Sequence, residues 1–334
     1  MTTRIFDEWA QYATPPNNYI GTTIFLSYIV LALYATTSIS YSLFTQYTNI
    51  FRAHPKDKDE LRNTSRFARA RHIKIYAFLA SISFATLSYH MLFFLITHYE
   101  HWSDEALSAV SGEKAKRWML ESTLFQDFAT ELVENKRNAV WTQIAILATW
   151  LWNIWMGRKA RTHIFSASSM GHFLLLSQIL PICFTACLFI IQLHLSSPDM
   201  QLSETKGQIT TPATARRKII ASLHLPNILL NASLLALPSL RSHSIFMSLV
   251  LLERIILALP HTGLVSLRAS DVDKSTIVSA GFIVASQVMA RQSSGHFGAE
   301  AQALWKSGYA VKALGWDAVL GMGVWGCLAW GGGV

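Results

Sequence analysis

Apolar runs long enough to cross a bilayer recur along almost the whole of this 334-residue chain. A transmembrane helix needs about 20 mainly apolar residues. Eight stretches of this kind are found, at 19–44, 73–98, 138–157, 170–195, 219–240, 244–266, 275–291 and 314–331. Only 14% of the residues are charged, against about 25% in a soluble domain. We therefore expect an all-α fold, a polytopic membrane bundle of about eight transmembrane helices that forms one domain over residues 1–334.

Basic residues predict the orientation of this bundle. The loop from 45 to 72 carries seven of them, at Arg52, Lys56, Lys58, Arg62, Arg66, Arg69 and Arg71. The positive-inside rule places such a loop in the cytosol, so its charge indicates a membrane protein and not a nucleic-acid partner. The N-terminus, the loop 99–137 and the C-terminus then become lumenal. We expect a multi-pass protein of the endoplasmic reticulum. The later loops are less decisive, because the basic residues at 216–218 fall on the lumenal side in this count.

The segment 116–136 differs from the runs around it. Apolar residues repeat there at helical spacing with acidic residues between them. This pattern is typical of an amphipathic helix that lies in the membrane interface. We expect one lumenal amphipathic helix that covers the end of the bundle.

Two carboxyl groups, Glu253 and Asp317, fall inside predicted spans. An ionisable group at that depth is expensive and is a functional hypothesis by default. Structural interpretations exist for both groups. Arg254 or Arg241 could neutralise Glu253, and Asp317 could complement the N-terminus of a helix.

Further acids gather at the predicted lumenal end, namely Glu100, Glu121 and Asp127. Asp127 stands between Phe125 and Phe128. Desolvation there would raise the pKa of its carboxyl and keep it protonated as a proton donor. The alternative is a solvated polar face. The order of candidate catalytic acids is Asp127, then Glu121 and Glu100, then the two acids inside the spans.

Aromatic and polar residues inside the spans are candidates for substrate binding. They are His90 and Phe94 in the second span and Trp150, Trp152 and Asn153 in the third. Aromatic faces stabilise cations, and the two tryptophans lie deeper than an interfacial belt requires. Packing inside the bundle is the alternative, and for an isolated histidine it is the commoner role.

No motif predicts a metal or a cofactor. Cys183, Cys187 and Cys327 lie in apolar runs without the spacing of a zinc site or a disulfide framework. The chain has no histidine array, no phosphate-binding glycine loop and no pair of aspartates of the DDxxD kind. We therefore expect chemistry that needs no cofactor and no metal ion.

The strings RHIKIYAFLASISFATLSYHMLFFLITHYEHW, RWMLESTLFQDFATEL, NIWM and QILPICFTACLF resemble a fungal family of polytopic proteins. That family includes the membrane-bound meroterpenoid cyclases of the ascochlorin and ascofuranone pathways, and the resemblance covers roughly residues 1–195. It implies a terpene cyclase of secondary metabolism, an isomerase without a metal. Such an enzyme protonates the terminal epoxide of a lipophilic prenylated aromatic substrate, and an internal group captures the cation. The resemblance matches Glu100, Glu121 and Asp127 to the acids of the family.

Two other classes stay open. One is a non-catalytic membrane protein or a small-molecule transporter. A transporter is expected to show internal repeats or broken helices in corresponding halves, and the prolines at 181, 226, 238 and 260 form no matched pairs. The other is a different lipid-modifying enzyme.

Overall fold

The computed structural model describes residues 12, 14–53, 60–104, 111–163, 165, 167–179, 181–197, 221–291 and 298–331. Within these ranges the chain is helical, and the one strand pairing is an isolated parallel bridge between Ala221 and Val265. The helices are α2 (Tyr19–Ala53), α3 (Glu60–Ser103), α4 (Gly112–Glu121), α5 (Leu124–Leu132), α6 (Lys136–Thr162), α7 (Ala167–Ile179), α8 (Ile182–Leu195), α9 (His224–Leu240), α10 (Phe246–Thr262), α11 (Ala269–Arg291), α12 (Gly298–Lys306) and α13 (Tyr309–Ala329). The predicted all-α class is confirmed.

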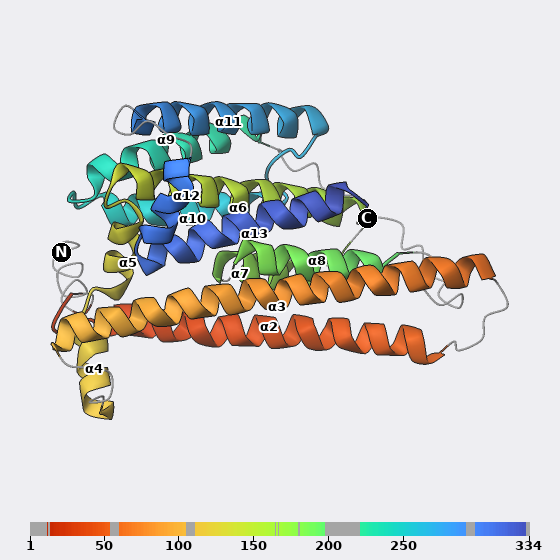
Figure 1. The fold of residues 1–334 in the computed structure, drawn as a ribbon, viewed down its shortest axis with the longest axis horizontal. Helices are drawn as coiled ribbons and strands as arrows, with labels where there is room; N and C mark the ends of the chain where they lie inside the picture. The colour runs from red at the N-terminus through yellow and green to blue at the C-terminus, as the bar shows by residue number, and fades with distance from the viewer. Residues whose placement is uncertain are drawn as a thin grey trace, which may run out of the picture.

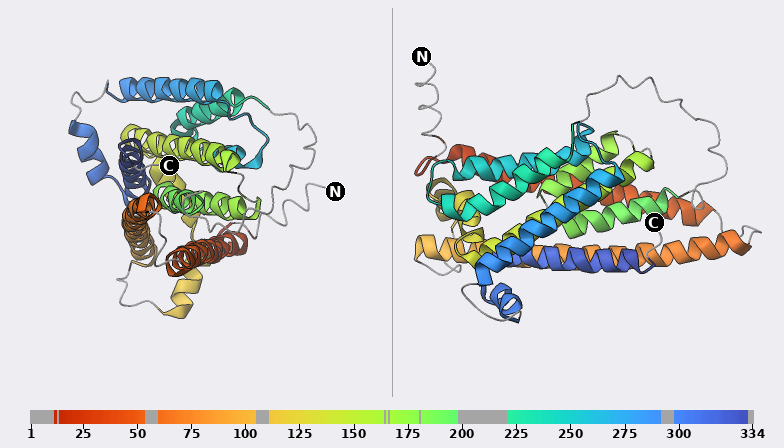
Figure 2. Two further views of the ribbon diagram at one scale, coloured as in Figure 1. Left: turned by 90° about the vertical axis from the view of Figure 1, so that its right-hand side faces the viewer. Right: turned by 90° about the horizontal axis from the view of Figure 1, so that it is seen from above.

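The long helices form a bundle in which α6 and α13 lie between two groups of helices (Figures 1 and 2). On one side α2, α3, α7 and α8 pack around a first apolar core. On the other side α9, α10 and α11 pack against α6 around a second core, which reaches α5 and α12. The two central helices contribute side chains to both cores, so the chain forms one continuous bundle.

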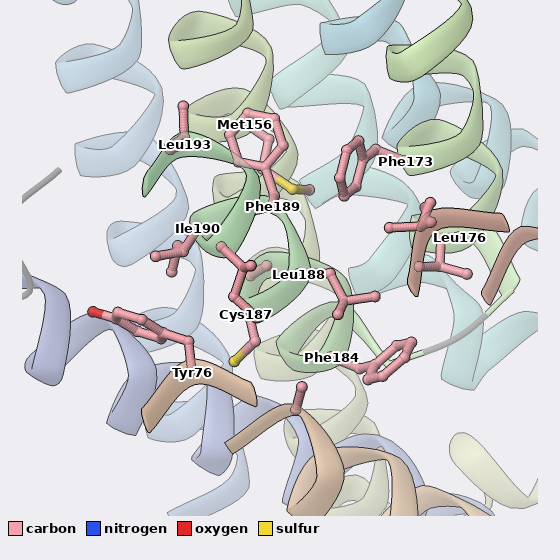
Figure 3. Close-up of a cluster of buried hydrophobic side chains, with 14 of the residues drawn as sticks. Tyr76, Met156, Phe173, Leu176, Phe184, Cys187, Leu188, Phe189, Ile190 and Leu193 are labelled. Atoms are coloured by element: carbon pink, nitrogen blue, oxygen red, sulfur yellow. The ribbon is translucent and has the colours of Figure 1, made fainter. Parts of the chain in front are cut away.

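Helix α8 is the most deeply buried helix of the first group. All of its residues except Gln192 are buried, because the run 182–195 is apolar on every face and a helix of that kind needs neighbours all around it. Figure 3 shows its side chains packed among Tyr76 of α3, Met156 of α6 and Phe173 of α7.

Helices α7 and α8 fold back on each other. The rings of Phe173 and Phe189 lie 5.2 Å apart, although 16 residues of one straight helix would separate them by about 24 Å. The fold-back occurs at Pro181, because proline lacks an N–H and disfavours helical backbone in the residue before it. The prediction of a single span at 170–195 is therefore wrong. At 13 and 14 residues, each helix is about 20 Å long and shorter than a bilayer core.

This hairpin changes the path of the chain through the bundle. Helices α2 and α13 both begin beside α4 and α5, where Thr22 donates to the Met119 carbonyl and Ala310 donates to Glu131. We call this the α5 end. Helix α13 finishes at the opposite end (Figure 1). The described helices that run from end to end are α2, α3, α6, α9, α10, α11 and α13. Helix α2 thus begins at one end and α13 finishes at the other, because the hairpin returns to the end from which it started. The prediction that both termini lie on one side concerns residues 1–11 and 332–334, which lie outside the described residues.

Other boundaries also differ from the predictions. The basic stretch 45–72 is helical apart from residues 54–59, which lie outside the described residues, as do residues 105–110 of the predicted lumenal loop. The predicted amphipathic helix 116–136 is two helices, α4 and α5, which meet at Ser122 and Thr123, where the backbone of Ser122 is extended. Helix α12 has no counterpart among the predicted spans.

Two described helical stretches are long and apolar enough to cross a membrane, Tyr19–Phe51 and Arg66–Ser103, with mean hydropathies of 1.6 and 1.7. Few of their residues are buried, and large apolar side chains are also exposed on α9, α10, α11 and α13. Exposed apolar surface of this extent marks contact with a membrane or a partner. The two long helices indicate membrane association.

Candidate functional site

Four side chains form a chain of hydrogen bonds at the α5 end. The indole N–H of Trp118 (α4) donates to His98 Nδ1 (α3) at 2.9 Å. His98 Nε2 lies 3.1 Å from Asp127 Oδ2 (α5), and the Thr123 hydroxyl donates to the same oxygen at 2.8 Å. These hydrogen bonds hold α4 and α5 against the last turns of α3.

The contact with Trp118 determines which ring nitrogen of His98 carries a hydrogen. An indole nitrogen only donates, so His98 Nδ1 must be the unprotonated acceptor and Nε2 carries the hydrogen that points at Asp127. Burial raises the pKa of Asp127, but the hydrogen bonds from His98 and Thr123 outweigh it and leave that pKa below its ordinary value. The predicted upward shift of the Asp127 pKa is therefore wrong. The flanking phenylalanines do not decide this pKa, because the carboxylate has two hydrogen-bond donors and a half-exposed side chain.

Glu131, one turn beyond Asp127, has the opposite character. Its Oε1 accepts the N–H of Ala310 at 2.9 Å and so clamps the start of α13 to α5. A Cβ added to Gly308 would lie 1.9 Å from this oxygen, so only glycine leaves room for the clamp. Burial raises the pKa of Glu131, against the lowering effect of the Ala310 N–H.

These two shifts predict opposite pH effects on stability. The lowered pKa of Asp127 stabilises the fold above the unfolded pKa, and this contribution is lost as the pH falls through the folded value. The raised pKa of Glu131 stabilises the fold below the unfolded pKa, and this contribution is lost as the pH rises through the folded value.

We expect Asp127→Asn to lower the melting temperature at pH 7, with a deficit that narrows only below about pH 4. We expect Glu131→Gln, which keeps an acceptor for Ala310, to match or exceed wild type at pH 7 and to lose that advantage near pH 4. Melting curves of the purified wild type and of both variants from pH 3.5 to 7.5 measure these effects. Both assignments would be contradicted if, at pH 7, Asp127→Asn were more stable than wild type and Glu131→Gln less stable.

A second polar group is buried between α6, α9 and α11. The Trp150 indole N–H donates to Asn227 Oδ1 at 2.8 Å, and the Ser279 hydroxyl donates to the same oxygen at 3.0 Å. Asn227 Nδ2 donates to the Ser275 carbonyl, and Asn231 Nδ2 donates to the Asn227 carbonyl and to Ser279. All five side chains are buried. We call this group and its extension along α10 the buried polar seam.

The seam continues on the other side of α6. Asn153 Nδ2 donates to the Leu257 carbonyl of α10 at 3.0 Å, and Asn153 Oδ1 lies 3.0 Å from His261 Nε2. Glu253 precedes Leu257 by one helical turn and is 4% exposed. Glu253 therefore places one carboxyl group on the same buried face of α10 as Leu257, next to Arg254 in the sequence.

Glu253 has an oxygen without a partner. Its Oε1 is buried and has no hydrogen bond within the described part of the chain, while its carboxyl contacts the Ser233 hydroxyl. Ser233 gives its single hydrogen to the Leu230 carbonyl at 2.9 Å. A hydrogen bond between Ser233 and Glu253 that leaves the Leu230 bond intact therefore requires a hydrogen on the carboxyl. The two arginines considered as neutralising partners donate elsewhere, Arg254 to the Gln178 carbonyl and Arg241 to the Glu134 carbonyl.

A cavity of about 340 Å³ reaches the seam from the outer face of the bundle. It lies between α9 and α11, and Asn227 forms part of its wall together with Ile228, Ile277 and Val278. Ile228 and Ile277 are exposed, so the mouth of this cavity is partly apolar, and His224 and Lys274 complete its lining.

The remaining predicted residues have structural surroundings. Both oxygens of Asp317 accept the first N–H groups of α8, Ile182 at 2.8 Å and Cys183 at 3.0 Å. Trp152 packs edge-on against Trp155 and Trp325. Phe94 packs against Phe128, beside the Asp127 chain. His90 faces Tyr309, Glu100 is partly buried in α3, and Glu121 is exposed at the end of α4.

The structure thus separates the predicted site into two places. Asp127 and Phe94 belong to the α5 end, while Trp150, Asn153 and Glu253 belong to the seam. His98, Thr123 and Asn227 were missed. Asn227 and Asn231 could have been found, because they stand four residues apart in an apolar run and so share one helix face.

Comparison of the chain with protein-family models, with curated proteins and with solved structures finds no match. In the described part of the chain, no group of three or more His, Cys, Asp and Glu side chains is placed to share a metal ion.

Proposed function

We propose that this protein is a membrane-bound terpene cyclase. In this proposal it opens the terminal epoxide of a prenylated aromatic substrate by protonation and lets the resulting cation cyclise. The observation that carries the proposal is Glu253, a buried carboxyl with an unpartnered oxygen beside a seam that an apolar cavity reaches. The sequence resemblance to meroterpenoid cyclases supports the same chemistry.

The reaction would proceed in three steps. The Glu253 carboxylic acid transfers its proton to the epoxide oxygen, and the C–O bond at the more substituted carbon breaks. The tertiary cation then accepts the electron pair of an internal alkene, which forms a ring bond. Return of a proton from the last cation to the Glu253 carboxylate gives the product, an isomer of the substrate. Aromatic rings close to the path stabilise the cation, and Trp150 is a buried aromatic ring of the seam, where it donates to Asn227.

The direct test is turnover in isolated membranes. We expect membranes that contain the protein to convert an epoxyprenyl phenol to a cyclic isomer of equal mass, at the same rate with and without excess chelator. The chelator matters because each step above uses groups of the chain alone. Loss of turnover that magnesium restores would rule out this mechanism, and absence of product from a panel of epoxyprenyl substrates would rule out the function.

The proposal includes a polytopic arrangement in the membrane, in the endoplasmic reticulum. The seven end-to-end helices would be the spans, and α7 with α8 would enter from the cytosolic side and return to it. The basic residues at the end of α6 favour a cytosolic position for the end opposite α5. Exposed apolar side chains on six of the seven helices support contact with lipid.

This arrangement predicts that the two termini lie on opposite sides of the membrane. A glycosylation acceptor added before Met1 should be modified in microsomes, and one added after Val334 should stay unmodified. Modification at both ends would contradict the seven-span path and favour eight spans.

A transporter is the second candidate, and the α7–α8 hairpin favours it. Discontinuous helices that meet inside the membrane commonly form the substrate sites of transporters. At this hairpin the Gln178 carbonyl accepts from Tyr28 and from Arg254, so polar groups already meet at the break. Uptake of a solute into vesicles, without any conversion of epoxyprenyl substrate, would select this candidate.

A further inference from the structure

A second cavity, of about 620 Å³, lies at the α5 end between the first turn of α6 and α12. Its walls are polar and basic. They are formed by Asn135, Lys136, Arg137, Asn138, Gln302, Ala303, Lys306 and Ser307. Neither the seam nor the Asp127 chain contributes a residue to it, so the proposed function leaves this cavity unexplained.

Three cations line this cavity. Lys136, Arg137 and Lys306 are exposed, and none of their side chains has a hydrogen bond or an ion pair with any other described residue. The two acids nearest to Lys136 and Arg137 in sequence make no ion pair with them, and the side chain of Glu300, the acid nearest to Lys306 in sequence, lies outside the described residues. Glu131 accepts the Ala310 N–H, and Glu134 is exposed.

Hydrogen bonds hold the two asparagines of this wall in place. The side chain of Asn135 accepts from the N–H groups of Arg137 and Asn138 at 3.1 and 2.9 Å. The Asn138 amide donates to the Glu131 carbonyl at 3.1 Å. Both asparagines are thus held in place, and the wall that they form is rigid. Three like charges around one hollow repel each other, and an anion of two or more charges removes that repulsion.

We propose that this cavity binds a phosphoryl group. A guanidinium binds phosphate oxygens in pairs, and ammonium groups bind them as point charges. The Gln302 amide and the Ser307 hydroxyl add neutral hydrogen-bond donors of the kind that phosphate oxygens accept. A cavity of this volume accommodates a phosphate or a diphosphate with part of the group attached to it. The ligand is either the headgroup of an anionic phospholipid or a soluble phosphate ester.

The test compares two double variants of the full-length protein purified in a neutral detergent. Arg137→Gln with Lys306→Gln removes two cations of the cavity. Lys116→Gln with Arg117→Gln removes two exposed cations of α4 at the same end and serves as the charge-matched control. Binding of pyrophosphate is measured by titration at about 50 and 200 mM salt. Binding of phosphatidic acid is measured with vesicles of phosphatidylcholine that contain it or lack it.

We expect wild type and the α4 control to bind at least one probe, and the cavity variant to bind it at least tenfold more weakly. Binding of pyrophosphate alone identifies a soluble phosphate ester, and binding of phosphatidic acid vesicles alone identifies a lipid headgroup. The proposal fails if neither probe binds wild type, if both double variants lose binding equally, or if sulfate binds as tightly as pyrophosphate. A third double variant, Arg137→Lys with Lys306→Arg, keeps both charges. We expect it to retain the wild-type melting temperature and the binding, which separates a charge effect from misfolding.

Discussion

Exchange of Glu253 for glutamine is expected to reduce turnover of an epoxyprenyl substrate by about 10²- to 10⁴-fold, the usual contribution of a positioned acid. Glutamine has nearly the same size and can still face Ser233, but it cannot transfer a proton to the epoxide oxygen. The loss should appear in kcat and leave the amount of folded protein in the membrane unchanged. Turnover in isolated membranes, normalised to protein by immunoblot, measures it.

The control for this experiment is Glu113→Gln, which alters an exposed acid in the first turn of α4. It should retain the wild-type rate. A second variant, Glu253→Asp, retains a carboxyl group on a shorter side chain and should recover part of the activity. Near wild-type turnover of Glu253→Gln would remove Glu253 as the proton donor.

Failure of this prediction is distinguishable from failure of the function itself. If wild type converts the substrate and Glu253→Gln does so equally well, the cyclase assignment stands and the acid changes. If wild type converts no epoxyprenyl substrate, the transporter becomes the better candidate, because the α7–α8 hairpin is then the feature that needs explanation.

The all-α class of this fold could be predicted from the sequence, because apolar runs long enough to form helices recur along it. Seven of the predicted apolar runs correspond to single helices. The ends of most of these helices differ from the predicted ends by a few residues, and some differ by more than two helical turns. Helix α3 is the extreme case, since it begins at Glu60, well before the apolar run that starts at 73. Hydropathy identifies only the apolar part of a helix. It does not detect a polar extension of the same helix.

The hairpin could have been predicted from one residue. Pro181 interrupts the run 170–195, and each half is too short to cross a bilayer alone. Hydropathy averages over this interruption and reports one span. On the proposed seven-span path, this single reversal exchanges the predicted sides of every later loop. The basic residues at 216–218 are among those that the eight-span path places on the lumenal side.

The site was harder to predict, because its chemistry depends on contacts between distant residues. Asp127 stands between two phenylalanines in the sequence, yet its environment is decided by His98, 29 residues earlier. Glu253 has an arginine as its neighbour, yet Arg254 turns to Gln178 of the hairpin. Local sequence describes what surrounds a side chain along the helix, whereas desolvation and pairing depend on what lies across from it.

The second large effect is expected from Asp317, which holds the start of α8. Two N–H groups at the start of a helix have no partner within that helix, and at α8 they are buried, so water cannot replace the carboxylate. Asp317→Ala leaves both groups unpaired, at about 1–3 kcal/mol each. We expect a loss of about 2–5 kcal/mol in the free energy of unfolding, measured as a lower melting temperature in detergent. Asp317→Asn keeps one acceptor oxygen and should lose about half as much.

The position of Cys183 gives this prediction a local readout. Its N–H is one of the two groups that Asp317 accepts, and its side chain is buried. In a background with Cys187→Ser and Cys327→Ser, a membrane-permeant maleimide should label Cys183 slowly in the parent protein and faster after Asp317→Ala, because the first turn of α8 then opens. Asp273→Asn, which changes an exposed acid of α11, should alter neither the melting temperature nor the labelling. A lower melting temperature with unchanged labelling of Cys183 would show that Asp317 stabilises the bundle by some route other than the start of α8, and equal stability of all three Asp317 forms would show that the hairpin needs no cap.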